Sequence, residues 1–362
     1  MIRIIRSFIL ILFAVFLFAE VGRASETNSP EGHTETTKNF EAGKYVIEHV
    51  SDAYEWHIAT FGETHISIPL PIILHSSEKG WNFFMSSRFH HGHETYNGFR
   101  IEHDGEHEGK IVEVNETGEV IGVPVDLSIT KTVAGIFVSV FVLMAIFLSI
   151  AKSAKKNTNQ APKGLQNLFE PIILFIRDEV AKPAIGEKKF EKFLPFLLTA
   201  FFFILVNNLL GLIPIFPFGA NVTGNIAVTL VLALFTFFIT TINGNKHYWK
   251  EIYNPDVPWW LKFPIPLMPI VELSGLITKP FVLMVRLFAN MMAGHLIVTV
   301  FVSLIFIFNS LMGVEAGLGV SPISIAFSVF ILLLDVLVSF IQAYVFTLLS
   351  ALYFGMATSE HH

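Results

Sequence analysis

Two segments near the C-terminus, 265–311 and 321–357, stay apolar for longer than the core of a soluble protein could accommodate. A helix of ~45 residues runs ~68 Å, whereas the hydrocarbon core of a bilayer is ~30 Å thick. Ordinary tilts of ~20° do not absorb that excess. We therefore expect two long helices that lie oblique in a membrane, or that bend at a position such as Pro280. Such helices expose a flank, which favours a partner surface over a self-contained pore.

The composition agrees with a membrane protein that carries a polar appendage. Hydrophobic residues make up 52% of the 362 residues and charged residues only 15%, whereas an ordinary soluble domain has about a quarter charged residues. There is no cysteine, which excludes disulfides, thiolate metal ligands and cysteine nucleophiles. The predicted fold class is an all-α polytopic membrane protein with a small β-rich N-terminal module.

The N-terminus reads MIRIIR, then SFILILFAVFLFA, then EVGRASETNS. A basic start, a ~13-residue apolar run and small residues near Ala24 predict a signal peptide over 1–24. The alternative is a short membrane anchor, although the run is below the ~20 residues of a normal span. In either case the residues that follow are delivered outside the cytoplasm.

Residues 25–127 form the predicted extracytoplasmic extension. Its first part, 25–44, is rich in Glu, Thr, Ser and Gly and is typical of disorder. From Tyr45 onward the runs HISIPLPIIL, GFRIEH, GKIVEV and EVIGVPVDLSI are separated by turn signals, which predicts strands.

Histidines are concentrated in this extension, since ten of the 14 in the chain fall between His33 and His107. A metal-binding module is one interpretation, based on His90, His91, His93, His103 and His107. The spacing is irregular and acidic residues surround these histidines, which favours a solvated polar surface without a metal. Titration of residues 25–127 with zinc or copper distinguishes the two.

From residue 128 to residue 362 we predict about five membrane helices. The three shorter ones are expected at 129–151, 193–213 and 222–243, with an amphipathic stretch between the first two. The loops after the first and third of these are rich in Lys, whereas the turns at 214–221 and 312–321 contain neither Lys nor Arg. The positive-inside bias then puts the N-terminal module outside and the C-terminus in the cytoplasm of an inner-membrane protein, if each long segment crosses once.

Arg286 is the residue that an apolar helix tolerates least. No Asp, Glu, Lys or Arg follows it before Glu315. A guanidinium at bilayer depth costs at least ~3 kcal/mol and cannot lose its proton, because its pKa lies above ~12. A partner or a function must therefore require a permanent positive charge here. A structural ion pair with Asp335 is the alternative.

Helical geometry places polar residues on one stripe with Arg286. At ~100° per residue, Glu272, Lys279 and Asn290 all lie within about 40° of it. Glu272 and Lys279 could instead extend to the interface at a helix end. The stripe leads from Arg286 toward the cytoplasmic end of the helix.

A second polar route is predicted on other faces. His295 lies about 180° round the helix from the arginine stripe, and Asp335 and Gln342 share a face of the last helix. Asn208 and Asn225 lie on the preceding helices, toward the outer side. Histidine titrates near neutral pH and burial raises a carboxylate toward it, which suits a proton relay. The amides could equally be interhelical hydrogen-bonding groups.

The residues around Arg286 also carry a family resemblance. KPFVLMVRLFANMMAGHL resembles the central arginine motif of subunit a of F-type ATP synthases, and IQAYVFTLLSALY resembles the signature of its last helix. NLLGLIPIFPFGANVTGNIAVTL is similar to the two preceding helices. The resemblance covers roughly 129–357 and says nothing about the extension at 25–127.

The resemblance implies a non-catalytic, proton-translocating stator subunit in the cell inner membrane, without cofactor or metal. Its expected partners are a ring of c subunits, b-type peripheral stalk subunits, the remainder of the ATP synthase and membrane lipid, with no nucleic acid. Arg286 would meet the carboxylate of the ring, and Glu272 would belong to the outlet half-channel. Matches to the inlet half-channel are Asn290, His295, Asp335 and Gln342.

Two positions vary within this family. Some members carry the acid where His295 is and the histidine where Asp335 is, whereas this chain has them exchanged, as in the mitochondrial type. Some members carry an acid at the position of Gly211, which leaves the outer part of the inlet route less defined.

A secondary ion-coupled transporter with its own substrate site is the alternative function. Such folds usually contain internal repeats with paired interrupted helices. No matching halves are found in this sequence.

Overall fold

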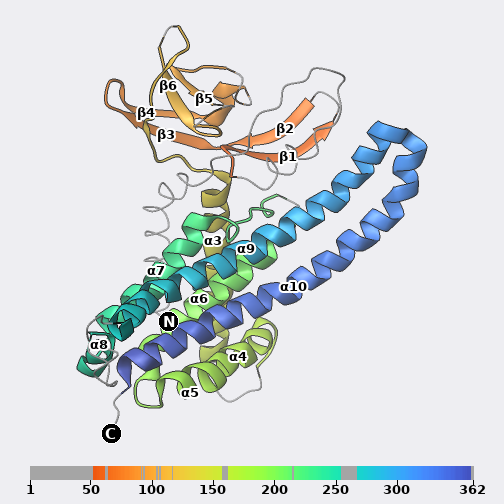
Figure 1. The fold of residues 1–362 in the computed structure, drawn as a ribbon. Coiled ribbons are helices and arrows are strands. Elements are labelled where there is room, and N and C mark those ends of the chain that lie inside the picture. Colours follow the sequence, from red (N-terminus) through yellow and green to blue (C-terminus); the bar gives the residue numbers. More distant parts are fainter. Residues whose placement is uncertain are drawn as a thin grey trace.

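The computed structural model describes residues 52–61, 64–90, 92, 94–102, 105, 107–115, 117–156, 162–213, 216–253 and 267–359. A small β-rich module lies at one end of a helical bundle (Figure 1). The predicted signal peptide over 1–24 and the predicted disordered segment 25–44 lie outside the described residues.

The module consists of short antiparallel strands. The first two, β1 (Glu55–Phe61) and β2 (Thr64–Pro69), form a hairpin. One three-stranded sheet has the order β4-β3-β8, and another has the order β5-β6-β7. Their bounds are β3 Pro71–Ser76, β4 Gly80–Met85, β5 Phe99–Ile101, β6 Ile111–Val114, β7 Val120–Gly122 and β8 Val125–Asp126, with a 3-10 turn η2 at Ser86–Phe89.

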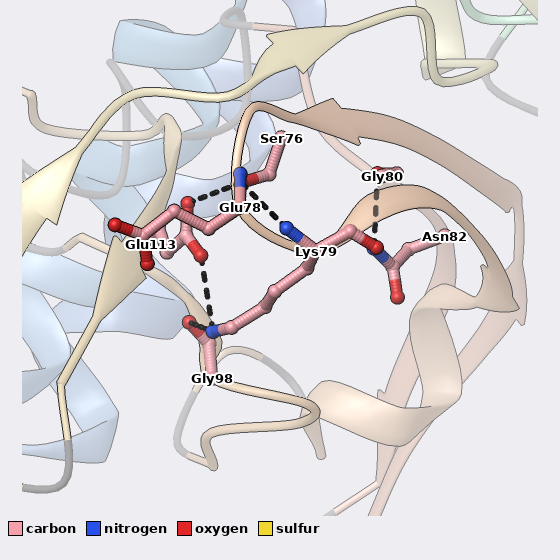
Figure 2. Close-up of polar contacts among 7 residues, drawn as sticks. All are labelled: Ser76, Glu78, Lys79, Gly80, Asn82, Gly98 and Glu113. Carbon is pink, nitrogen blue, oxygen red and sulfur yellow. Dashed lines mark hydrogen bonds and ion pairs between the residues drawn. The ribbon is translucent and has the colours of Figure 1, made fainter.

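The core of the module lies between these two three-stranded sheets. Successive side chains of a strand point to opposite faces, so Ile72 and Leu74 of β3 share one face, and both are buried together with Phe99 and Ile111. Figure 2 shows the polar edge of this core. Ser76 donates a hydrogen bond of 2.6 Å to Glu113, and the Lys79 ammonium lies 3.2 Å from the same carboxylate.

The predicted β-rich module is thereby confirmed, and the strand runs expected from the sequence contain β2, β3 and β5 to β8. Strands β1 and β4 were not predicted. The sequence of β4, GWNFFM, does not alternate cleanly between apolar and polar residues, because its solvent-side positions are apolar as well.

The bundle begins with α3 (Lys131–Lys156), followed by a broken amphipathic stretch. That stretch consists of α4 (Leu165–Phe175), a π-helical turn η3 (Ile176–Ala181) and α5 (Lys182–Ile185). The remaining helices are α6 Phe190–Gly211, α7 Ile226–Ile242, α8 Lys246–Tyr253, α9 Leu267–Met312 and α10 Val314–Thr358. In the described part of the chain four helices are long and apolar enough to cross a membrane, or five if α7 and α8 count as one bent span.

Burial differs sharply between these helices. Of the 18 most apolar consecutive residues of α6, 72% are buried, and Phe201, Phe202 and Phe203 of this helix form the centre of the hydrophobic core. In the equivalent 18-residue stretches of α9 and α10, only 17% of the residues are buried. Helix α6 is therefore at the centre of the bundle; α10 packs along it, and α9 packs on α10 and α7.

The long helices form one hairpin, with the turn at the end of the bundle that carries the module (Figure 1). Helix α9 has 46 residues and α10 has 45. Gly313 forms the turn at a φ of 90°, a left-handed conformation that glycine adopts without strain. The turn predicted at 312–321 is therefore wrong, since α10 resumes at Val314 and continues through Pro322.

The module is fixed to the bundle at two places. The Asp52 carboxylate accepts a hydrogen bond of 2.9 Å from the backbone of Thr132, in the first turn of α3. Trp56 of β1 is 4% exposed and packs edge-on against Phe216, in the loop between α6 and α7, at 5.4 Å between ring centroids. The hairpin β1–β2 thus belongs to the packing of the membrane domain as well as to the module.

Basic residues gather at the opposite end of the bundle, where α4, α5 and α8 lie (Figure 1). Asp178 accepts hydrogen bonds from Arg177 at 2.7 and 2.9 Å, and Lys182 lies 2.5 Å away. The guanidinium first, and the ammonium second, hold the pKa of the Asp178 carboxyl well below its usual range.

The histidine-rich part of the module is only partly described. His91, His93 and His103 lie outside the described residues, and His90 lies 3.6 Å from Glu94. Within the described ranges no group of three or more His, Cys, Asp or Glu side chains is placed to hold a metal ion.

Candidate functional site

Arg286 lies on the outer flank of α9. Its side chain and that of Asn290 are exposed, while Leu283 and Leu287, on another face of the same turns, are buried against the bundle. No Asp or Glu among the described residues forms a salt bridge with Arg286, so the predicted alternative of an ion pair with Asp335 is not formed. A permanent cation is thus presented away from the chain, on an apolar surface.

The stripe continues from Arg286 to the end of the bundle away from the module. Lys279 is half-buried and its ammonium lies 5.8 Å from the centroid of the Tyr353 ring of α10. Both line a small hollow between α7, α8, α9 and α10, which Thr236, Thr240 and Tyr248 also line. Glu272 lies two turns further along the helix and is half-buried. The stripe therefore passes a small, mainly apolar hollow before it reaches Glu272.

His295 faces inward, against α6. A methyl group built on Gly211 would lie 3.6 Å from the Nε2 atom of His295, so the imidazole is stacked on the glycine at the end of α6. The ring is therefore separated from the exposed face of Arg286, as the helical spacing predicts. The tightest contact of such a methyl group would be with the Ala220 carbonyl, at 3.2 Å, and its contact with the imidazole would be an ordinary van der Waals one.

Asp335 of α10 is brought to the same region by another glycine. A methyl group built on Gly294 would lie 2.8 Å from both carboxylate oxygens of Asp335. The carboxylate thus lies against the backbone of Gly294, the residue before His295. The Oδ2 atom of Asp335 is buried and, within the described residues, has no hydrogen-bond partner. It is free to accept a proton or a water molecule.

Amide groups lie on both sides of this cluster along the bundle. Asn208 is fully buried in α6, and its carbonyl accepts a hydrogen bond of 2.5 Å from the Thr223 hydroxyl. Its amide nitrogen makes no hydrogen bond to any described residue. Gln342 is buried, at 6% exposed, and lies on the same face of α10 as Asp335, two helical turns later. The carbonyl of Asn225 accepts from the backbone of Ala227 at 2.9 Å, which makes it the N-cap of α7.

Sequence reasoning missed several residues of this arrangement. Gly294 has a signal, because a small residue beside a polar one inside an apolar helix is typical of a close helix–helix contact. Thr223 and Tyr353 have none, because ordinary membrane helices contain many such residues and only the tertiary structure selects these two.

Family models account for nearly all of the described chain. A model described as ATP synthase A chain matches residues 134–355. A second, described as a domain of unknown function (DUF8433), matches residues 45–128 and so covers the β-rich module.

Individual relatives match about two thirds of this chain. ATP synthase subunit a of Chloroherpeton thalassium is 45% identical over 242 residues, which are 65% of this chain and 68% of that protein. ATP synthase subunit a 2 of Chlorobaculum tepidum is 48% identical over 241 residues, 65% of this chain and 64% of that protein. ATP synthase subunit a of Myxococcus xanthus is 42% identical over 244 residues, 66% and 75% of the two chains.

Proposed function

The chain belongs to the ATP synthase A chain family, and on this premise we propose that it is the stator subunit a of an F-type ATP synthase, which carries protons to and from a rotating ring of c subunits. It is a subunit of the complex and not itself the catalytic one. The observation that carries the proposal is Arg286, an exposed cation on an apolar flank that no described carboxylate of this chain neutralises. The carboxylate is expected on the ring.

A fixed positive charge beside a moving carboxylate has a defined chemical effect. A ring carboxylate that passes Arg286 is held in its ionised form, because a nearby opposite charge lowers the pKa of the acid. Arginine supplies no removable proton, so it also separates the two half-channels and prevents a direct leak. The ring carboxylic acid releases its proton on one side of Arg286, and the carboxylate takes up a new proton on the other side, which couples proton flow to rotation.

The polar side chains that face into the bundle around His295 and Asp335 are proposed as the inlet half-channel. His295 follows Gly294 on α9, and Asp335 lies against Gly294 from α10. Imidazole and carboxylate groups can both take up and release protons. Asn208, Gln342 and Asn290 extend the polar path toward the module and toward the ring. Asn225 keeps its predicted place on this path, although its carbonyl already caps α7.

The arginine stripe is proposed as the outlet. Glu272 lies at its far end, and Lys279, which borders a small hollow beside Tyr353, lies between Glu272 and Arg286. Because the two routes lie on different sides of α9, a proton passes from one to the other only on the ring.

Orientation and tilt complete the proposal. The module at 25–127 is extracytoplasmic and the membrane domain, from residue 128, has its C-terminus in the cytoplasm; the basic residues around α4, α5 and α8 support this through the positive-inside bias. The hairpin of α9 and α10, at ~69 Å, is far longer than a ~30 Å hydrocarbon core, and it runs at a slant to α3 (Figure 1). Its exposed flank is the surface for the c ring, and b-type stalk subunits contact other faces.

A secondary transporter is not favoured, since the relatives that the chain matches are named ATP synthase subunits.

A cross-linking experiment tests the ring contact directly, because the chain has no cysteine of its own. Asn290→Cys should cross-link to a cysteine next to the ring carboxylate. Phe141→Cys, on α3 and 74% exposed, should not. Equal cross-linking of both, or of neither, would remove the proposed ring contact.

A further inference from the structure

The module has an apolar surface that the proton-conducting function does not use. It lies on the sheet β4-β3-β8, on the face opposite the module core. Trp81, Phe83 and Met85 of β4 are 55%, 68% and 42% exposed, and Val125 of β8 is 54% exposed. Ile73 and His75 of β3 lie between them, because Ile73 pairs with Phe83 and His75 pairs with both Trp81 and Val125. None of these residues carries a fixed charge.

The side chains of this surface are already ordered against one another. The Trp81 and Phe83 rings stack at 6.0 Å between centroids, and the His75 ring meets Trp81 edge-on at 4.8 Å. Continuous exposed apolar surface of this kind marks an interaction site on most soluble domains. It therefore needs an occupant.

The connection of the sheet to α3 places one corner of it at the membrane boundary. The backbone of Ile129 donates a hydrogen bond of 3.0 Å to Pro71, the first residue of β3. Membrane helix α3 begins two residues later, at Lys131. Pro71 also pairs with Met85, so the Met85 end of β4 lies next to the start of a membrane span. From there Phe83 and Trp81 follow at ~3.3 Å per residue.

The layering of the module determines where this surface points. Ile72, Leu74 and Ser76 face β5 and β6, and the bond from Ser76 to Glu113 fixes β6 on that side of β3 (Figure 2). In Figure 1 the strands β5 and β6 lie on the side of β3 and β4 away from the helices. The opposite face, with Trp81 and Phe83, is consequently directed toward the side of the bilayer.

From this placement we propose that the face formed by Ile73, His75, Trp81, Phe83, Met85 and Val125 rests on the lipid leaflet beside α3, as an interfacial membrane contact of the module. Aromatic side chains are enriched at the headgroup level, where an apolar ring and a polar edge are both accommodated. Apolar faces of interfacial elements are buried ~5–10 Å into this boundary. The proposal is independent of the proton path.

Spin labelling tests the occupant. The assembled complex is reconstituted in vesicles of phosphatidylcholine and phosphatidylglycerol, with one nitroxide at Phe83→Cys or, as the matched control, at Thr117→Cys in the exposed turn between β6 and β7. The parent complex without the new cysteine supplies the background. The label at residue 83 should collide with oxygen several-fold more, and with aqueous nickel–EDDA several-fold less, than the label at residue 117.

Two results would overturn the proposal. Nickel–EDDA access at residue 83 equal to that at residue 117 would mean that the face is open to water. Protection from both oxygen and nickel–EDDA would mean that protein covers it, whether another subunit, a second copy or another segment of this chain.

Fluorescence provides a second test that leaves Phe83 intact. The Trp81 signal is obtained as the difference between the complex and its Trp81→Phe variant, in vesicles that contain lipids brominated near the headgroup or deep in the acyl chain. Shallow bromine should quench the Trp81 signal several-fold more than deep bromine. A Trp81 signal that iodide quenches and neither brominated lipid affects would contradict lipid contact.

Discussion

Two polar groups on the same helix, nine residues apart, face opposite surroundings. Arg286 points off the flank of α9 with an exposed side chain, whereas His295 is turned into the bundle, against Gly211 of α6 and beside the contact of Gly294 with Asp335. The difference shows a division of labour. Under the proposed function, the group that cannot titrate is presented to the ring, and the groups that can titrate are half-buried between helices of this chain.

Removal of the exposed charge should have the largest effect. Arg286→Ala is expected to abolish ATP-driven proton pumping while the complex still assembles, because the exposed side chain supports no packing inside this chain. Vesicle acidification, measured with a pH-sensitive dye, gives the result, and subunit composition on a native gel controls for assembly. Arg286→Lys keeps a charge but one that can deprotonate, so it should also be defective. Normal pumping by an assembled Arg286→Ala complex would contradict the proposed role.

Removal of the enclosed titratable pair should slow transport without abolishing it. We expect Asp335→Asn combined with His295→Ala to lower the rate of proton uptake on the order of 10²-fold, the usual contribution of positioned proton-transfer groups. Water can still enter the route, so some flux remains. The pH profile of pumping distinguishes this from a packing defect, because only loss of a titrating group moves the profile. An unchanged rate and profile would return both residues to a structural role.

The contact that positions Asp335 can be changed without touching a titratable group. Gly294→Ala places a methyl 2.8 Å from the carboxylate oxygens, so Asp335 must move or α9 and α10 must separate. Overpacking of this kind costs ~1–3 kcal/mol, and we expect proton uptake to fall about tenfold. Gly319→Ala is the control, because it adds a methyl on α10 with nothing within 4 Å.

A transplanted carboxylate separates position from packing. Gly294→Asp combined with Asp335→Gly moves the acid from α10 to α9. The glycine that it contacts then lies on α10. Uptake should recover above that of Gly294→Ala. If the transplant is as slow as Asp335→Asn, proximity to His295 is not what the acid needs.

The comparison also shows which part of the site the sequence could predict. The opposition of Arg286 and His295 follows from helical spacing within one segment, and the predicted bounds 265–311 lie within two residues of α9. The contact of Gly294 with Asp335 depends on how far α9 slides along α10. That register is a tertiary property, set in part by the turn at Gly313 and the close packing of Gly317 on Asn309.

The errors have similar physical causes. Glycine and proline between residues 313 and 322 read as a turn, yet contact with α9 keeps that stretch helical. Strand β1 was missed because Trp56 is buried against the loop between α6 and α7 rather than in the module core. The preference of these residues for helix or strand contains no information on either tertiary contact.

The smallest effect on proton transport is expected from loosening the module. Trp56 is 4% exposed in the hydrophobic core of the membrane domain, and truncation of a buried aromatic costs ~3–5 kcal/mol. Trp56→Ala should therefore lower the thermal stability of the chain in detergent and open the segment before α3 to proteolysis. Trp81→Ala is the matched control, since Trp81 is 55% exposed and its removal leaves no cavity. Pumping should fall less than in Gly294→Ala, because Trp56 contacts the loop through Phe216 and reaches neither His295 nor Arg286. A larger loss than in Gly294→Ala would mean that the module, through this loop, helps to hold the inlet route open.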